Sequence, residues 1–420
     1  MELLLRKLCD IAVRDGRLEV VTASGNRFVA GDGAGEPAVT MRFTDEAAQR
    51  ALVLYPEMKL GELFMDGRLV LERGSIYDLL ALLMRGRPGG RGVWGSRLVR
   101  RLRRAALALF ARNGERRARA NVHHHYDLDH RLYDLFLDPD RQYSCAYFER
   151  PGQSLDEAQL AKKRHIAAKL LVEPGHAVLD IGCGWGGLAL YLAGVAGAGR
   201  VTGVTLSTEQ HETARERAAK HGLSSRIEIA LMDYRRVEGT FDRIVSVGMF
   251  EHVGPAHYQE FFDTTAGLLR EDGVMLLHTI GSTGEPGPTN PWITRWVFPG
   301  GHIPALSEMI PAIERAGLRL ADVEVLRLHY AETLRAWRGR FLARREEAAR
   351  LLDARFCRMW EFYLASCEAA FRYEDLVVFQ LQLTRRNDVV PTTRDYIGER
   401  ERMLRGLEAG TTRAAARRTG

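Results

Sequence analysis

Hydrophobic and polar positions follow different periodicities in successive parts of the chain. Up to residue 84, short apolar runs such as RLEVVTASGNRFVAG alternate with turn residues and end in the helical pattern IYDLLALLM. From about residue 121, strand-like runs such as HAVLDIG and RVTGVTLS alternate with helical patterns. This alternation predicts a mainly parallel sheet with helices on both faces. Residues 331–371 predict long helices, and LVVFQLQLTRR predicts a late edge strand.

These periodicities divide the chain into four segments. We expect a small α+β domain over 1–84, an arginine-rich linker over 85–120, a doubly wound α/β domain over 121–400 and a loose basic tail over 401–420. The chain has 420 residues, which is enough for two or three domains. No apolar run approaches the roughly 18 residues of a membrane span, and the N-terminus lacks the pattern of a secretory signal. A cytoplasmic protein is therefore expected.

Positive charge is concentrated in the linker. Residues 85–119 hold twelve arginines and one acid, Glu115, so they carry +11 while the whole chain carries +6. Within this stretch, SRLVRRLRRAALALFAR (96–112) places leucines and alanines on one helical face and arginines on much of the rest. Such a helix could lie in the headgroup region of an anionic membrane or pack as a linker on the catalytic domain. Nucleic acid is a weaker alternative because no recognition motif accompanies the charge.

Cysteine and histidine give no metal site. The five cysteines are an odd number without a CxxC pair, which is typical of reduced thiols rather than of disulfides or zinc ligands. The run His123-His124-His125 cannot direct consecutive side chains at one centre on a helix or strand, and no Cys or acidic cluster completes a ligand set. No metal is expected.

A glycine-rich turn follows the first predicted strand of the α/β domain. The sequence D-I-G-C-G-W-G-G begins at Asp180 and contains Gly182, Gly184 and Gly186, which allow the backbone to approach a ligand closely at the start of a helix. The spacing differs from the GxGxxG of dinucleotide-binding proteins, and the second strand ends in GVTLS without an acid. Asp180 can instead orient the loop and an ammonium group, which favours S-adenosylmethionine over NAD.

Polar residues also stand at the ends of the next two strands. Asp233 can accept a hydrogen bond from an adenine amino group beside the ring of Tyr234, while Thr205 and Gln210 are candidate partners of a ribose. Each residue alone is more often structural than functional. Together, on consecutive strand ends of one sheet, they mark the crevice in which doubly wound folds bind ligands.

Five motifs in order resemble the cyclopropane-fatty-acyl-phospholipid synthase family and its mycolic acid cyclopropane synthase relatives. They are RQYSCAYFE, VLDIGCGWGG, GVTLSTEQ, FDRIVSVGMFEHVG and LLHTIGS, and the resemblance covers roughly residues 121–387. It implies the class I methyltransferase fold with helical insertions that form an acyl-chain tunnel. The first 84 residues look like the smaller lipid-binding-type domain of the members that act on phospholipids. The implied substrate is an unsaturated phospholipid, reached at an anionic membrane surface by a peripheral protein at the inner face, and relatives suggest a homodimer.

The resemblance also implies a mechanism and its residues. Methyl transfer to an alkene leaves a carbocation, and the family uses a bound bicarbonate ion to remove the proton. Its cage falls on Glu251, His278 and Tyr330 and on the backbone of Cys145 and Ile280. In physical terms Glu251 and His278 can share protons with bicarbonate, and Tyr330 can donate a hydrogen bond.

Further residues of these motifs carry weaker expectations. Tyr143 and Ser144 match family positions that contact the cofactor. Tyr143, Tyr147 and Phe148 can present ring faces to a cation, although for Phe148 an ordinary core position is the better interpretation. Cys367 matches a cysteine once proposed as a nucleophile, but its neighbours suit a tunnel or core residue. Cys183 is interpreted as a small packing residue.

Several functions remain open at this stage. The leading hypothesis is cyclopropanation, and a close alternative gives a methylene- or methyl-branched acyl chain through the same cation. A noncatalytic lipid-binding protein is a different class of function, and the Glu251, His278 and Tyr330 set argues against it. A methyltransferase for a polar small molecule would need a water-accessible pocket.

Overall fold

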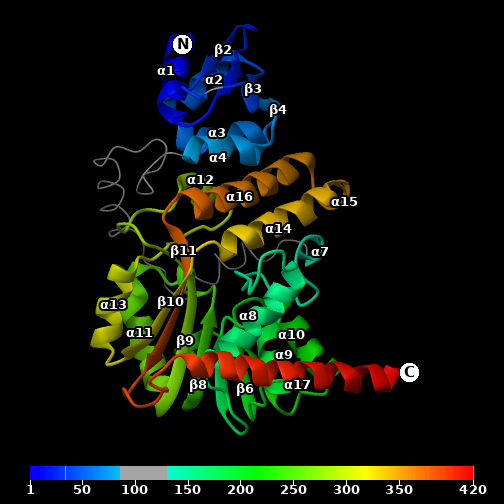
Figure 1. The fold of residues 1–420 in the computed structure, drawn as a ribbon, viewed down its shortest axis with the longest axis vertical. Coiled ribbons are helices and arrows are strands. Elements are labelled where there is room, and N and C mark those ends of the chain that lie inside the picture. The colour runs from blue at the N-terminus through cyan, green and yellow to red at the C-terminus, as the bar shows by residue number, and fades with distance from the viewer. Residues whose placement is uncertain (34, 86–129, 420) are drawn as a thin grey trace.

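The computed structural model describes residues 1–33, 35–85 and 130–419. The basic segment 96–112 and the histidine run at 123–125 lie outside the described residues. Figure 1 shows the N-terminal domain stacked on a layer of helices, which in turn covers one end of the larger α/β domain. Strands form two sheets, one of four strands in the N-terminal domain and one of seven in the α/β domain.

The N-terminal domain is a small α+β unit, as its pattern predicts. Its sheet has the order β2-β1-β3-β4, with β1 parallel to β3 and the other neighbours antiparallel. Helices start where polar caps occur: Asp45 accepts a hydrogen bond from the Ala48 N–H, and Ser75 and Asp78 form a capping box. Its elements are α1 (Glu2–Ala12), β1 (Leu18–Val21), β2 (Arg27–Ala30), β3 (Val39–Phe43), α2 (Glu46–Leu54), α3 (Pro56–Met65), β4 (Leu69–Arg73) and α4 (Ile76–Met84).

The second sheet has the order β10-β11-β9-β8-β5-β6-β7 and is parallel from β9 to β7. The strand expected at an edge, β11, lies between β9 and β10 and is antiparallel to both. That expectation was wrong because β10 covers the outer edge, and eight of the nine residues of β11 are buried. The strands are β5 (Ala177–Ile181), β6 (Arg200–Thr205), β7 (Ile227–Leu231), β8 (Phe241–Val247), β9 (Leu269–Ser282), β10 (Arg319–Leu326) and β11 (Leu376–Thr384).

Helices cover both faces of this sheet, as the alternating pattern predicts. On one face, apolar side chains of α8, α9, α10 and α17 pack against alternate sheet residues such as Val178 and Val245. On the other, α11 and α13 pack against Leu179 and Ile244. These helices are α8 (Leu155–Lys169), α9 (Gly187–Gly194), α10 (Thr208–Lys220), α11 (Tyr258–Leu268), α13 (Leu306–Arg315) and α17 (Asp395–Thr419).

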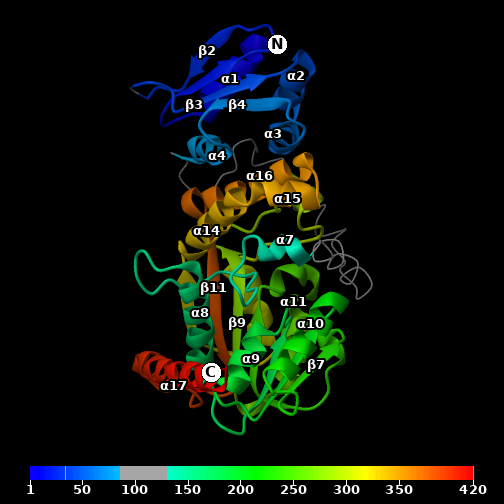
Figure 2. The same ribbon diagram turned by 90° about the vertical axis from the view of Figure 1, so that its right-hand side faces the viewer.

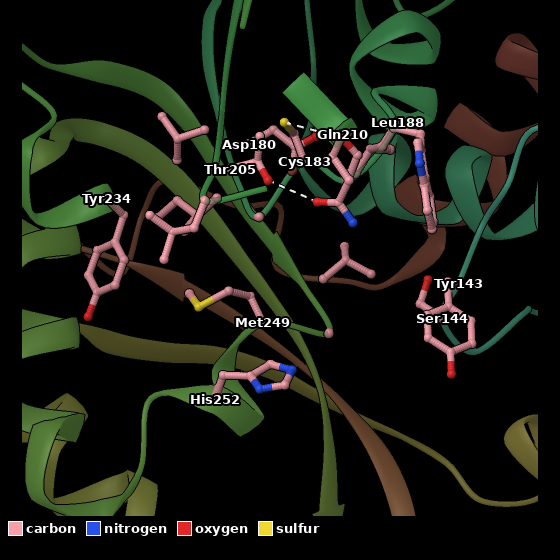
Figure 3. A pocket seen from close by; sticks show the side chains of 18 of the residues that line it. Tyr143, Ser144, Asp180, Cys183, Leu188, Thr205, Gln210, Tyr234, Met249 and His252 are labelled. Atoms are coloured by element: carbon pink, nitrogen blue, oxygen red, sulfur yellow. Dashed lines mark hydrogen bonds between the residues drawn. The ribbon is translucent and has the colours of Figure 1, made fainter. Parts of the chain in front are cut away.

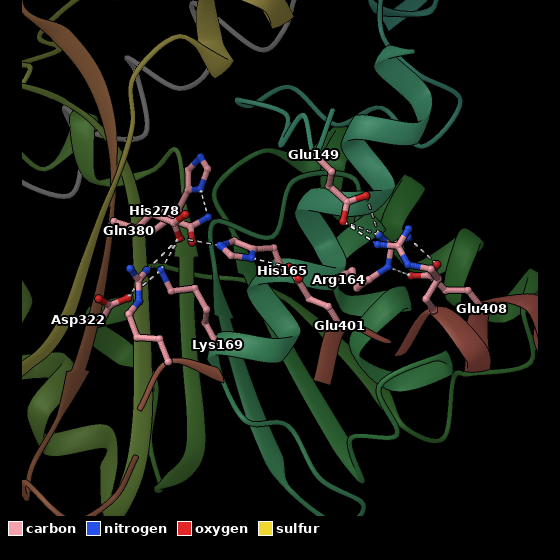
Figure 4. Close-up of polar contacts among 12 residues, drawn as sticks. Glu149, Arg164, His165, Lys169, His278, Asp322, Gln380, Glu401 and Glu408 are labelled. Atoms are coloured by element: carbon pink, nitrogen blue, oxygen red, sulfur yellow. Dashed lines mark hydrogen bonds and ion pairs between the residues drawn. The ribbon is translucent and has the colours of Figure 1, made fainter. Parts of the chain in front are cut away.

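The segment expected to be a loose tail from residue 401 is part of helix α17. Leu404 is only 3% exposed, and Glu408 accepts hydrogen bonds from Arg164 at 2.7 and 2.9 Å and from the Tyr191 hydroxyl at 2.6 Å. Figure 4 shows this carboxylate facing the side chain of Arg164. The basic, small-residue composition suggested disorder, but these anchors fix the helix to the sheet domain over residues 401–408.

A layer of helices separates the two domains, as Figure 2 shows. Helix α16 packs against α3 and α4 on one side and against α14 on the other. One apolar core therefore continues from the N-terminal domain through this layer to the loop at residues 143–148. The layer contains α7 (His130–Asp134), α12 (Pro291–Trp296), α14 (His329–Ala343), α15 (Arg345–Leu351) and α16 (Ala354–Tyr373).

Candidate active site

Two adjoining cavities lie where the helical layer meets the α/β domain. The smaller holds about 170 Å³ and is lined by residues at the carboxyl ends of β5, β6, β7 and β8. The larger holds about 1020 Å³ and extends beneath the helical layer to α3 and α4. Tyr143, Ser144, Gly248 and His252 line both cavities, so the two meet at these residues.

The smaller cavity gathers most of the residues that the sequence assigns to the cofactor. They are Tyr143, Ser144, Asp180, Gly182, Gly184, Thr205, Gln210, Asp233 and Tyr234. Gly182 has a φ of 80°, and a Cβ there would lie 2.9 Å from the Met249 Cβ. Gly186, also expected here, is not among the lining residues. It begins helix α9 with a φ of 79° and leaves room for the Cβ of Ala214, so its role in this structure is packing.

Asp180 is the buried acid of this cavity. It stands on β5 and is 1% exposed, and burial raises its pKa to about 7. Its Oδ2 has no hydrogen-bond partner within the described parts of the chain. Figure 3 shows the side chain beside Cys183 and Thr205. A buried carboxylate with an open oxygen favours a ligand that brings positive charge or hydrogen-bond donors.

The remaining polar side chains of this cavity are held by neighbours. Thr205 donates to the Oε1 of Gln210 at 2.9 Å (Figure 3), which leaves the Gln210 amide nitrogen as a donor. Burial opposes ionisation of Asp233, but hydrogen bonds from Arg235 outweigh it and lower the pKa of this carboxyl group. Arg235 approaches Asp233 Oδ2 at 2.7 Å. Asp233 is therefore a pre-oriented anion at the end of β7.

Several lining residues of this cavity were not found from the sequence. Lys162 comes from α8, a helix without any motif, and Met249 and His252 follow β8. Trp185 lies inside the glycine turn and donates its indole N–H to Glu209 at 3.0 Å. A strand–glycine–helix pattern locates the turn, but it gives no sign of which side chains a distant helix contributes.

The larger cavity brings together all five residues of the expected base site. Glu251 follows β8 on a short 3-10 helix (Phe250–His252), His278 and Ile280 stand on β9, Tyr330 on α14 and Cys145 on a loop. Glu251 Oε1 accepts the Ile280 backbone N–H at 2.6 Å. In this structure the Ile280 N–H therefore orients the carboxylate.

Glu251 and His278 each present an unpaired polar atom. Burial raises the pKa of Glu251 to about 7 and lowers the pKa of His278 to about 3, so the imidazole is neutral near neutral pH. Gln380 on β11 lies 3.2 Å from His278 Nδ1 (Figure 4). Among the described residues, Glu251 Oε2 and His278 Nε2 have no partner. Two buried groups that can exchange protons suit a small polar ligand.

Aromatic residues surround part of this cavity, but not as the sequence indicated. Tyr143 lines both cavities, and its hydroxyl lies 3.0 Å from the Tyr363 hydroxyl. Tyr147 lines neither. Its ring is stacked between His165 at 4.2 Å and His329 at 5.0 Å, so the expectation that it faces a substrate cation was wrong. Phe148 contacts the ring of His329 and lines neither cavity.

Much of the remaining wall of the larger cavity is apolar, although the acids Glu57, Glu285, Glu374 and Asp375 also line it. Leu60, Leu80 and Leu83 of the N-terminal domain line it from one side. Cys367 and Phe371 of α16 line it from the other. Burial raises the pKa of the Cys367 thiol to about 12, so this side chain is a neutral wall residue rather than a thiolate.

The fold and the smaller cavity define a class I S-adenosylmethionine-dependent methyltransferase. Comparison with known proteins gives the family. Residues 113–381 match the model of the mycolic acid cyclopropane synthetase family, and the chain belongs to this family. It is 40% identical over 326 residues to the cyclopropane-fatty-acyl-phospholipid synthase of Escherichia coli K12, which covers 78% of this chain and 82% of the relative.

Two further relatives bear on the active site. The tuberculostearic acid methyltransferase UfaA1 of Mycobacterium tuberculosis is 41% identical over 281 residues, or 64% of this chain and 65% of that protein. The mycolic acid cyclopropane synthase CmaA1, whose structure holds SAH and CTAB, superposes with a TM-score of 0.59 and 34% identity over 63% of this chain and 97% of its own. The likeness confirms the methyltransferase fold.

Proposed function

We propose that this enzyme makes a cyclopropane ring on an unsaturated acyl chain of a membrane phospholipid. The observation that carries the proposal is the junction of a cofactor pocket with a large apolar cavity, beside the unpaired atoms of Glu251 and His278. An acyl chain can lie in the apolar cavity with its double bond near the residues that line both cavities. The E. coli relative is named for this substrate class.

S-adenosylmethionine supplies an electrophilic methyl group when it is bound. The residues of the chain hold the double bond in line with that group and exclude water, which would otherwise trap the carbocation. Neutral side chains such as the Cys367 thiol suit this task because they are poor nucleophiles. Ring closure then requires loss of a proton from the added methyl group.

The polar pair beside the junction fits a bicarbonate ion as the base. Neutral His278 can donate through Nε2, and protonated Glu251 can donate through Oε2, to the oxygens of an anion. Tyr330 lines the same space. The bicarbonate ion would accept the proton. Glu251 and His278 would hold this ion in place and, because both are uncharged, would not present an ionised side chain to the carbocation.

A second product is favoured by a specific observation. UfaA1 and a Pseudomonas putida relative are named fatty acid or tuberculostearic acid methyltransferases rather than cyclopropane synthases. The same residues would serve a reaction in which a hydride shift precedes proton loss and gives a methylene-branched chain, and a separate reductant would be needed to convert it to a methyl-branched chain. A noncatalytic lipid-binding function would leave the buried pair of Glu251 and His278 without a purpose.

The test is to incubate the purified enzyme with S-adenosylmethionine, bicarbonate and vesicles of mono-unsaturated phospholipid. Mass spectrometry should show a gain of one CH2 per modified chain, and proton NMR should show upfield ring protons. The same mass gain with terminal-alkene protons would favour the branched product. No modified chain, with cofactor binding demonstrated, would contradict the proposed substrate.

We also propose that the enzyme reaches its substrate as a peripheral protein at the cytoplasmic face of an anionic membrane, as a homodimer. None of the described helices is long and apolar enough to cross a bilayer. The candidate membrane contact is the basic stretch 96–112, whose support is its sequence. Replacing arginines 97, 100, 101, 103 and 104 with Gln should reduce sedimentation with anionic vesicles, and unchanged sedimentation would contradict this contact.

A further inference from the structure

Lys162 on α8 is a buried cation that lines the cofactor cavity. It is 1% exposed, and its Nζ donates a hydrogen bond to Ser144 Oγ at 2.8 Å. No carboxylate oxygen of the described residues lies within 4.0 Å of this Nζ. An ammonium group has three donors, so two of them have no acceptor among the described residues.

The other cations of α8 show that this is a local exception. Lys163 pairs with Asp140 at 2.5 Å, and Lys169 pairs with Glu324 at 2.9 Å. Arg164 and His165 each contact two carboxylates, as Figure 4 shows. Among the positive or protonatable groups of this helix, only Lys162 faces the cofactor cavity, and it alone lacks a counter-ion within the same distance.

A buried ammonium without a counter-ion is costly. Burial lowers the pKa of Lys162 to about 8 against the opposing charge of Asp138, which makes no ion pair with it, so the group still carries a proton for much of the time at neutral pH. A cation buried without an ion pair costs folding free energy rather than contributing it. A role in ligand binding explains why a cation stands at this position.

Asp180 presents the complementary feature in the same cavity. Its Oδ2 is unpaired and its carboxylate is too far from Lys162 Nζ to form an ion pair. Both residues line the same cavity, and the charge of Lys162 opposes the rise of the pKa of Asp180. A cavity with one open cation and one open anion matches a zwitterion, and the methionine part of S-adenosylmethionine is an α-amino acid zwitterion.

We propose that Lys162 binds the carboxylate of the methyl donor, while Asp180 takes its ammonium group. The carboxylate of the donor and bicarbonate are both small oxyanions, so either could accept a hydrogen bond from Lys162 Nζ. Lys162 lines the cofactor cavity and not the larger one that contains Glu251 and His278, which favours the carboxylate of the donor. The proposal rests on the methyltransferase cofactor and is independent of the lipid product.

The test compares Lys162→Met with wild type by isothermal titration calorimetry, using S-adenosylmethionine and its decarboxylated analogue. Loss of a charge-assisted contact should weaken binding of S-adenosylmethionine by roughly 10- to 100-fold. The decarboxylated analogue should bind both proteins equally. Lys163→Met is the matched control from the same helix, and it should bind both ligands nearly as wild type does. If Lys162→Met does not fold, Lys162→Arg replaces it in the comparison. Because arginine keeps the positive charge, this variant should still bind S-adenosylmethionine more tightly than the decarboxylated analogue.

Three outcomes would overturn the proposal. Unchanged affinity of Lys162→Met for S-adenosylmethionine would remove the contact. Equal weakening for both ligands would mean that Lys162 acts only by holding Ser144. If Lys162→Met needs more bicarbonate for turnover but binds S-adenosylmethionine as wild type does, then Lys162 Nζ binds bicarbonate rather than the donor.

Discussion

The two cavities of this enzyme are built in opposite ways. The cofactor cavity is formed by short turns at the ends of parallel strands, and its polar groups are mostly fixed by neighbours, as Asp233 is by Arg235. The larger cavity lies between helices of two domains and is mainly apolar, with polar side chains such as Glu251 and His278 at the end nearest the cofactor. We propose that the first cavity recognises the donor through fixed polar groups, and that the apolar part of the second holds the lipid.

The largest expected effect comes from the polar end of the larger cavity. Glu251→Gln keeps the size of the side chain but removes its proton exchange, so turnover should fall by about 10²–10⁴-fold. Affinity for S-adenosylmethionine should not change because Glu251 does not line the cofactor cavity. Steady-state kinetics and calorimetry measure the two quantities. Equal loss of both would show that Glu251 is structural.

A smaller effect is expected from the glycine turn of the cofactor cavity. In Gly182→Ala the new Cβ would lie 2.9 Å from that of Met249 at a φ of 80°, so affinity for S-adenosylmethionine should fall about tenfold. Gly222→Ala is the matched control, because it has a similar φ of 68°, no atom lies within 4 Å of the added Cβ, and Gly222 does not line the cofactor cavity. A larger loss in the control would contradict this account of the turn.

The two buried acids should give opposite responses to pH. With a pKa raised to about 7, Glu251 is protonated below that pH and can donate to bicarbonate, whereas the carboxylate above it repels the anion. At saturating donor, the bicarbonate concentration for half-maximal rate should therefore rise above pH 7 by up to about tenfold per unit. Asp180, with a similar pKa, should bind the donor better as pH rises through 7, until loss of the proton from Lys162 near pH 8 weakens binding again.

The variant Glu251→Gln separates these two responses. It should remove the pH dependence of the bicarbonate requirement and leave the pH dependence of donor binding, measured by calorimetry, as in wild type. A bicarbonate requirement that still rises with pH in this variant would exclude Glu251 as the titrating group.

The smallest effect is expected where the N-terminal domain lines the larger cavity. Leu83→Ala on α4 widens a wall of the space proposed for the acyl chain, so the preference among chain lengths should shift by a few fold in kcat/KM. Leu5→Ala, in the core of the same domain but not in the cavity wall, is the control for general destabilisation. An identical change in both variants would count against a role of α4 in selectivity.

Local sequence patterns predicted those parts of the structure that are formed by residues close together in the sequence. The strand and glycine turn at 177–187 are continuous in sequence, so their position in the cofactor cavity was predictable. The base site was expected through family resemblance, and β9, a short 3-10 helix, α14 and a loop bring its five residues to one cavity. Long-range contacts were not predictable: Lys162 points into the cavity from a helix without a motif, and β11 is internal only because β10 pairs with it.

Two errors have the same cause. Tyr147 lies four residues from Tyr143 in sequence, but stacking between two histidines directs it away from the cavities. The segment after residue 400 looked loose because its few anchors, such as Leu404 and Glu408, act on distant elements. The contribution of α3 and α4 to the larger cavity likewise appears only when the two domains are assembled.

The most direct test of the central claim uses S-adenosylmethionine with a fully deuterated methyl group. With mono-unsaturated phospholipid vesicles, cyclopropanation through proton loss from the added methyl predicts a ring that retains two of its three deuterium atoms, without an alkene signal in the NMR spectrum. A product that keeps all three deuterium atoms, or one that carries them on an alkene carbon, would contradict ring closure by this enzyme.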